Sequence, residues 1–166
     1  MESFFGDELA FPLFRPHEVP KDDNAVRFVA ALRRADGVII ASPGYHGSVS
    51  GLIKNAIDYV ELMRDDARPY LEGRPVGCIS CAAGWQATAS TLSSLRAIVH
   101  ALRGWPTPLG AMLNSAVTTF TADGGWSDAS VASQLSCIAK QVCEFGSYRS
   151  DCLHPIIDNS VDNFLS

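Results

Sequence analysis

Short apolar runs rich in β-branched residues alternate along this chain with amphipathic helical patterns. The run at residues 37–42 is continuous, holds three β-branched residues and ends in a Pro-Gly pair, which is typical of a strand buried on both faces. Residues 74–80 repeat this pattern, and residues 107–113 form a third run. Runs of this length are too short for buried helices, so they predict strands.

Four longer stretches have the spacing of amphipathic helices. They cover residues 24–34, 52–64, 88–102 and 129–145. Asp22 or Asp23 is a suitable cap for the first of them. The alternation predicts an α/β domain, a three-layer sandwich in which residues 38–41, 76–80 and 108–113 are parallel neighbours. A ligand site is then expected at the carboxyl ends of the strands.

Composition excludes several classes of protein. A chain of 166 residues with 47% apolar and 19% charged residues predicts one packed domain, and no repeat or linker divides it. Net charge is −5 and the ten Arg and three Lys are scattered, so we expect no nucleic-acid partner. No apolar run approaches the roughly 20 residues of a membrane span. The start of the chain lacks a basic, apolar signal, so we expect a cytoplasmic protein.

The cysteines favour reduced thiols over a disulfide framework. There are five of them, an odd number, and only Cys78 and Cys81 have a paired spacing. That pair could be a redox couple or half of a metal site. Both residues lie in or next to a predicted strand, however, where positions three apart point to opposite faces.

The most specific pattern lies at residues 42–58, Ser-Pro-Gly-Tyr-His-Gly-Ser-Val-Ser-Gly-Leu-Ile-Lys-Asn-Ala-Ile-Asp. It resembles the S/T-P-x-Y-N/H-G-S-x-x-G-x-L-K-N-x-x-D stretch of the NADPH-dependent FMN reductase family, which includes quinone, azo-dye and chromate reductases. The resemblance continues more weakly through residues 73–76, 80–84 and 120–124, and covers about residues 9–145. It implies a flavodoxin-like fold.

By this resemblance, FMN is the cofactor and NADPH or NADH the co-substrate, and electrons pass to a small acceptor such as a quinone, an azo dye or free flavin. The flavin carries the chemistry, so no catalytic side chain is expected. Small residues let the backbone approach a planar heterocycle closely, and an aromatic ring can flank its plane. The residues expected to wrap the isoalloxazine are Pro43, Gly44, Tyr45, His46, Gly47 and Ser48, and those expected at its pyrimidine edge are Ser80, Ala82, Ala83 and Gly84.

The family's usual beginning, a strand and a G-S-x-R-x-x-S loop that holds the FMN phosphate, has no counterpart here. Residues 2–5 resemble a remnant of the family's second strand, and residues 9–14 the segment after it. In the strand order 2-1-3-4-5 the absent strand is central. We therefore expect a rearranged sheet, a strand from a partner, or a truncated reading of a longer gene, and weak FMN binding.

These considerations predict an N-terminally truncated flavodoxin-like domain at residues 1–146 and an extension at 147–166. They also predict homo-oligomers that form through the helix at 52–64, because an incomplete sheet leaves apolar surface to cover.

Two other classes of function remain. Residues 47–51 lie at a strand-to-helix turn like a hydrolase nucleophile elbow, but Val49 stands where G-x-S-x-G requires serine. A non-catalytic flavodoxin-like subunit or fragment that does not bind FMN is the stronger alternative.

Overall fold

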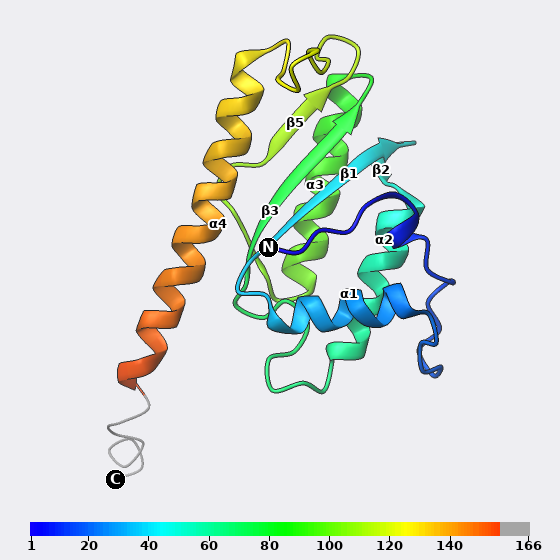
Figure 1. Ribbon diagram of the computed structural model, residues 1–166, viewed down its shortest axis with the longest axis vertical. Helices are drawn as coiled ribbons and strands as arrows, with labels where there is room; N and C mark the ends of the chain where they lie inside the picture. Colours follow the sequence, from blue (N-terminus) through cyan, green and yellow to red (C-terminus); the bar gives the residue numbers. More distant parts are fainter. Residues whose placement is uncertain (157–166) are drawn as a thin grey trace.

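A parallel sheet with helices on both faces forms the body of the computed structural model, which describes residues 1–156, with side chains to residue 148 (Figure 1). Its strands are β1 (Val38–Tyr45), β2 (Ser48–Val49), β3 (Pro75–Ala82), β4 (Trp105–Pro106) and β5 (Ala111–Asn114). The α-helices are α1 (Asp23–Arg34), α2 (Gly51–Asp58), α3 (Trp85–Ala101) and α4 (Ala129–Ile156), and the 3₁₀ helices are η1 (Gly6–Leu9) and η2 (Tyr59–Met63). The predicted α/β class is confirmed.

The central strand of the sheet is β3. It pairs in parallel with β1 on one side and with β4 and β5 on the other, while β2 pairs antiparallel with the far end of β1. The predicted parallel neighbours are thus confirmed. The single strand expected at residues 107–113 is wrong, because the chain forms β4 and β5 with a break between them. Pro106 ends β4 and Pro108 lies within the break, and proline has no N–H for a ladder hydrogen bond.

Burial of β1 differs from the expectation. We predicted a strand buried on both faces, but Ile39 is 46% exposed and Ala41 is also exposed. The reason is the path of α4, which packs mainly on β3 and approaches the sheet at Gly37 and Gly77. A Cβ on Gly77 would lie 2.5 Å from Ile138 of α4. The α4 side of β1 is therefore largely open.

One edge of β1 is open as well. Among residues 1–156, no strand pairs with residues 38–43 on the side away from β3. The remnant strand expected at residues 2–5 is wrong, since this segment forms no strand. Its contribution is to packing, because the ring of Phe4 lies edge-on against Phe28 of α1, 5.3 Å between centroids. Side-chain burial, not sheet pairing, holds the N-terminal segment.

Two predicted helices have different bounds in the structure. The expected helix at 52–64 is α2 followed by the tighter η2, and the change falls at Tyr59, whose hydroxyl donates to Pro12 O (2.9 Å) and whose ring packs against Phe11 and Phe14. The last helix continues past residue 145 to Ile156. The proposed domain boundary at 146 falls inside it, and residues 157–166 lie outside the described part.

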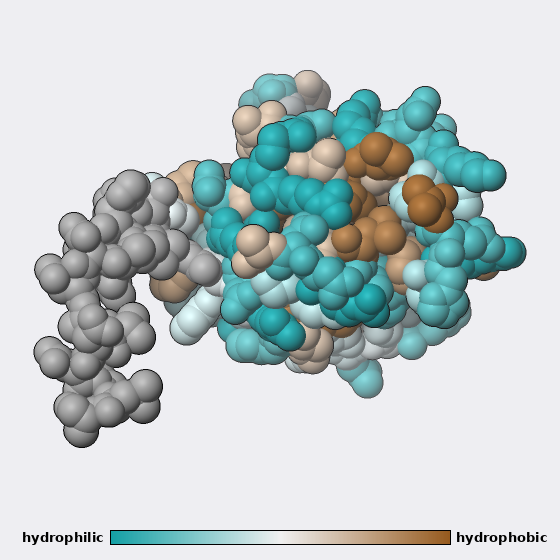
Figure 2. Space-filling view, turned by 90° about the horizontal axis from the view of Figure 1, so that it is seen from below, coloured by the Kyte–Doolittle hydropathy of each residue, from teal (hydrophilic) through white to brown (hydrophobic). Residues whose placement is uncertain are grey.

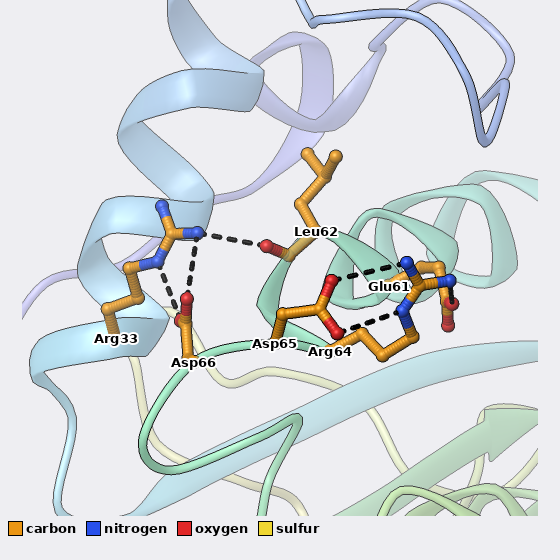
Figure 3. Close-up of polar contacts among 6 residues, drawn as sticks. All are labelled: Arg33, Glu61, Leu62, Arg64, Asp65 and Asp66. Atoms are coloured by element: carbon orange, nitrogen blue, oxygen red, sulfur yellow. Dashed lines mark hydrogen bonds and ion pairs between the residues drawn. The ribbon is translucent and has the colours of Figure 1, made fainter.

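Charged side chains connect α1 with η2 and the turn that follows η2. Figure 3 shows Arg33 of α1 reaching Asp66 (Nε to Oδ2, 2.8 Å) and the carbonyl of Leu62 (2.9 Å), and Arg64 contacting Asp65 and Glu61. These contacts tie the carboxyl end of α1 to the turn after η2.

Arg74 lies buried beside them. Its guanidinium donates to the carbonyls of Ala35 (2.9 Å), Tyr70 (3.0 Å) and Arg33 (3.2 Å), two of which end α1. A cation is favourable at the carboxyl end of a helix. The charged residues of these segments thus stabilise the fold.

Seen from below, hydrophobic residues gather among hydrophilic ones on one side of the body (Figure 2). Leu13, Val19 and Val26 are the exposed large apolar side chains of α1 and the segment just before it. Within the described residues, no helix has both the length and the apolar content needed to cross a membrane.

Candidate cofactor site at the carboxyl edge of the sheet

The predicted loop at 43–50 is a tight β-hairpin. Tyr45 of β1 pairs with Ser48 of β2, leaving a two-residue turn. His46 and Gly47 both have positive φ, 52° and 89°, which is the signature of a type I′ turn. This turn type matches the twist of two paired strands, which explains why most of the loop expected at 43–50 is paired as β1 and β2.

The hairpin rests on helix α3. Ser90 Oγ donates to the carbonyl of Gly47, and Thr91 Oγ1 donates to that of Ser48 (3.3 Å). Beneath them, a Cβ on Gly44 would lie 2.5 Å from Thr91 Oγ1 and 3.3 Å from the Ala87 carbonyl oxygen. Gly44 is therefore required for the close approach of β1 to α3.

The base of the hairpin is fixed by two buried serines. Ser50 N donates to Ser42 Oγ (3.1 Å), and Ser50 Oγ caps α2 by accepting from Ile53 N (3.2 Å). Capping is the usual role of serine in this position. The hydroxyl that follows Val49 is thus engaged in the fold, which weighs against a nucleophile elbow here.

The second predicted segment begins inside β3. Cys81 and Ala82 are its last residues, so the loop is shorter than the sequence indicated and consists of Ala83 and Gly84 before α3. Nothing lies within 4 Å of a Cβ at Gly84. Ser80 is fully buried, and its hydroxyl lies 2.8 Å from Thr88 O and 3.4 Å from Ala111 O. Its side chain thus supports this edge from inside the core.

The predicted residues lie at or directly after the carboxyl ends of β1 and β3, two strands paired in parallel up to the Pro43–Cys81 position. They differ in accessibility. Ser80 and Ala82 are buried, and Gly44 and Gly84 are half-buried. The other six are exposed: Pro43, Tyr45, His46, Gly47, Ser48 and Ala83. The edge thus offers an exposed hairpin beside a short loop of small residues, with the exposed ring of Trp85 at the start of α3.

A third segment of this edge escaped the sequence analysis as a site. It follows β5 and carries Phe120 and Trp126, whose backbones form an isolated antiparallel bridge. The Asp123-Gly124-Gly125 turn between them is a usable hairpin signal.

Cys78 and Cys81 have different surroundings. Burial within β3 raises the pKa of the Cys78 thiol to about 11. Burial alternates along the second half of β3, with Cys78 and Ser80 buried and Ile79 and Cys81 half-buried, as expected of two faces. A thiol that is protonated at neutral pH is a poor nucleophile and a poor metal ligand. Cys152 lies beyond the described side chains.

The residues present fit the ring of FMN better than its phosphate. The hairpin and the Ala83–Gly84 loop provide exposed backbone and small side chains, as a planar ring requires. Residues 43–50, 82–88 and 114–128 contain no Lys or Arg, however. Phosphate is recognised chiefly by Arg, Lys and converging backbone N–H groups. These segments thus supply no cationic side chain for the phosphate of FMN.

This is the architecture of a flavodoxin-like α/β protein. It has a parallel sheet with helices on both faces, and a hairpin containing glycine lies at the carboxyl edge, where ligands bind in such sheets. The sequence model of NADPH-dependent FMN reductase matches residues 4–118. The chain belongs to this family.

Two relatives are FMN-dependent NADPH-azoreductases of staphylococci. The protein of Staphylococcus haemolyticus (strain JCSC1435) is 35% identical over 85 residues, 51% of this chain and 42% of the relative. That of Staphylococcus aureus (strain USA300) is 39% identical over 74 residues, 45% of this chain and 36% of the relative. The matches span about two fifths of these relatives.

Solved structures share the fold. The flavoenzyme NAD(P)H:(acceptor) oxidoreductase FerB of Paracoccus denitrificans matches with a TM-score of 0.62 and 21% identity, over 76% of this chain and 70% of that one. An oxidoreductase of Corynebacterium diphtheriae matches with a TM-score of 0.57 and 22% identity, over 78% and 63% of the two chains. The flavodoxin-like fold predicted from the sequence is confirmed.

Proposed function

We propose that this chain forms part of a flavin-dependent oxidoreductase that uses NADPH or NADH to reduce a small acceptor such as a quinone, an azo dye or free flavin. The observation that carries the proposal is the type I′ hairpin of residues 45–48, fixed on α3 beside the Ala83–Gly84 loop in a member of the FMN reductase family. FMN, when bound, would accept hydride from the nicotinamide and pass on electrons.

The chain's own residues bind and orient in this proposal. The backbone of residues 43–48 would hold the ring, Tyr45 would flank it, and Ala83 and Gly84 would face its pyrimidine edge. Ser90 and Thr91 hold the hairpin in position through its carbonyls. We expect no side chain of this chain to transfer a proton or an electron in the reaction.

Affinity for FMN is expected to be low in this chain alone. Each charge-assisted hydrogen bond to a phosphate contributes about 1.5 to 3 kcal/mol, and the edge provides no cationic side chain for one. Addition of a strand and a phosphate loop, which could pair at the open edge of β1, should tighten binding. The non-catalytic alternative is favoured by the same open edge, and predicts no FMN binding at all.

Flavin titration followed by NADPH oxidation tests the proposal. Gly47→Leu should weaken FMN binding at least tenfold, whereas Cys78→Ala/Cys81→Ala should leave it within twofold. Because Gly47 has positive φ, Leu also strains the turn, so Gly47→Asn serves as a second variant with a residue that tolerates this backbone. Loss of activity in the cysteine variant with full activity in both Gly47 variants would overturn the assignment.

Self-association through residues 52–64 and a cytoplasmic location belong to the same proposal. Leu52 is 41% exposed at the start of α2, and the open side of β1 adds apolar surface. Sedimentation should show a dimer or larger species that Leu52→Glu dissociates. A monomer at micromolar concentration would refute the self-association.

A further inference from the structure

Residues 119–127, which we name the aromatic hairpin, form a small and well-bonded structure after β5. Thr121 N donates to Gly125 O (3.0 Å), and Gly124 N donates to Thr121 O (3.0 Å). Two positions further out, Thr119 and Ser127 exchange two hydrogen bonds of 2.9 Å. Gly124 has φ +80°, which favours glycine at the turn.

The aromatic hairpin presents a stacked pair of rings. The centroids of Phe120 and Trp126 lie 4.2 Å apart with 33° between the planes. Phe120 is 70% exposed, and Trp126 is half-buried. The two tilted rings pack against each other while Phe120 stays largely exposed, so a further planar ring could bind Phe120 with little loss of side-chain freedom.

The chain path places this pair at the edge that carries the proposed flavin site. Asn114, the last residue of β5, pairs with Ala82 of β3, and Ser115 N donates to Ala82 O (2.9 Å). Val117 and Thr118 N then bond to Asn114 O, which fixes the turn into the hairpin. In Figure 1 the segment between β5 and α4 accordingly lies at the carboxyl ends of β3 and β5.

The charged residues of the chain segment around the hairpin are all acidic. Asp123 and Asp128 are the only charged residues in the whole stretch 104–139. The Thr121 hydroxyl and the Gly125 amide donate to the Asp123 carboxylate and lower its pKa, and Ser130 does the same for Asp128. Both are therefore ionised at neutral pH, and an anionic ligand is repelled.

We propose that the aromatic hairpin binds the electron acceptor, a planar aromatic molecule, by stacking on Phe120, and that it selects neutral or cationic rings over anionic ones. This assignment rests on the proposed function for the acceptor's role. Residues 119–127 follow the stretch that the family model matches, 4–118, although residues 120–124 resemble the family weakly in sequence.

Equilibrium dialysis with two matched dyes, 4-aminoazobenzene and its 4′-sulfonate, tests the proposal without added flavin or nicotinamide nucleotide. The neutral dye should bind more tightly than the sulfonate. Phe120→Ala and Phe120→Leu should weaken its binding roughly three- to tenfold, as loss of a ring contact predicts, while Phe120→Tyr should retain it. Asp123→Asn should reduce the difference in binding affinity between the two dyes, and added salt should reduce this difference further.

The chain offers a matched control in a second aromatic pair, Trp105 and Phe145, with centroids 5.7 Å apart. It lies by β4, which pairs with the amino end of β3, and Phe145 is 43% exposed. Phe145→Ala should leave dye binding unchanged. Equal binding in the parent, Phe120→Ala and Phe120→Leu, or a preference for the sulfonate, overturns the proposal. If the dye binds at Phe120 but the flavin-supplemented protein does not reduce it, the proposed function fails and the binding site stands.

Discussion

Replacement of Gly44 by alanine tests how the hairpin is held. The added methyl group would lie 2.5 Å from Thr91 Oγ1 and 3.3 Å from both Ala82 Cβ and the Ala87 carbonyl oxygen. Thr91 is fully buried, branched at Cβ and bonded to Ser48 O, so it cannot simply rotate away. Overpacking of this kind costs about 1 to 3 kcal/mol, and we expect about 2 kcal/mol for Gly44→Ala.

A double-mutant cycle isolates the contact. Thr91→Ala removes the nearest atom at the cost of one hydrogen bond, about 1 kcal/mol. If the clash is the cause, Gly44→Ala/Thr91→Ala should be less destabilised than the sum of the single variants by about 1 kcal/mol or more. Urea unfolding followed by tryptophan fluorescence measures all three, and Gly51→Ala, with nothing within 4 Å of the added methyl group, is the control. Additive losses, or an equal loss in Gly51→Ala, would refute the reasoning.

Four further predictions concern stability and reactivity. Arg74→Met should lower the free energy of unfolding by about 3 kcal/mol or more, because the carbonyls at the end of α1 lose the hydrogen bonds of the buried guanidinium. A urea titration that shows a loss of less than about 1 kcal/mol would contradict this. Cys78 should resist iodoacetamide at pH 8 while the exposed Cys143 reacts. Folding raises the Cys78 pKa from 9.0 to about 11, so unfolding at a pH between these values releases a proton. The free energy of unfolding should therefore fall as the pH rises through this range, by up to about 1.4 kcal/mol per pH unit. Cys78→Ala should abolish this part of the pH dependence. His46→Gly should raise the unfolding midpoint by relieving the positive φ, and an unchanged or lower midpoint would count against a strained turn.

Apolar periodicity predicted the order and direction of the strands, because β1, β3 and β5 are each short β-type runs between helical patterns. It could not predict the exposure of β1, since that depends on where α4 crosses the sheet. The run Val38–Ile40 has the composition of a doubly buried strand whether or not a helix covers it.

The candidate site was predicted from a motif, and the structure changes the roles of two of its residues. Gly44 reads as a point of close approach to a ligand, yet its missing side chain makes room for Thr91. Ser80 reads as a polar contact at the flavin edge, yet its hydroxyl bonds within the core. Both distinctions depend on the face of the strand, which a loop motif alone does not specify. The aromatic hairpin was missed because Phe120 and Trp126 become neighbours only when the turn at 123–125 closes.

The open side of β1 explains why the contacts with α3 matter for the site. Within the described residues, positions 38–43 of β1 are bonded to β3 on one edge only, and the α4 face of β1 is largely uncovered. The hairpin that β1 carries therefore takes its position from α3, through Ser90, Thr91 and the close approach at Gly44. A change that loosens α3 from β1 should displace the ring-binding backbone even when the sheet remains paired. Conversely, a strand that paired along the open edge would fix the hairpin from the second side, so phosphate recognition and ring recognition would become coupled through β1 itself.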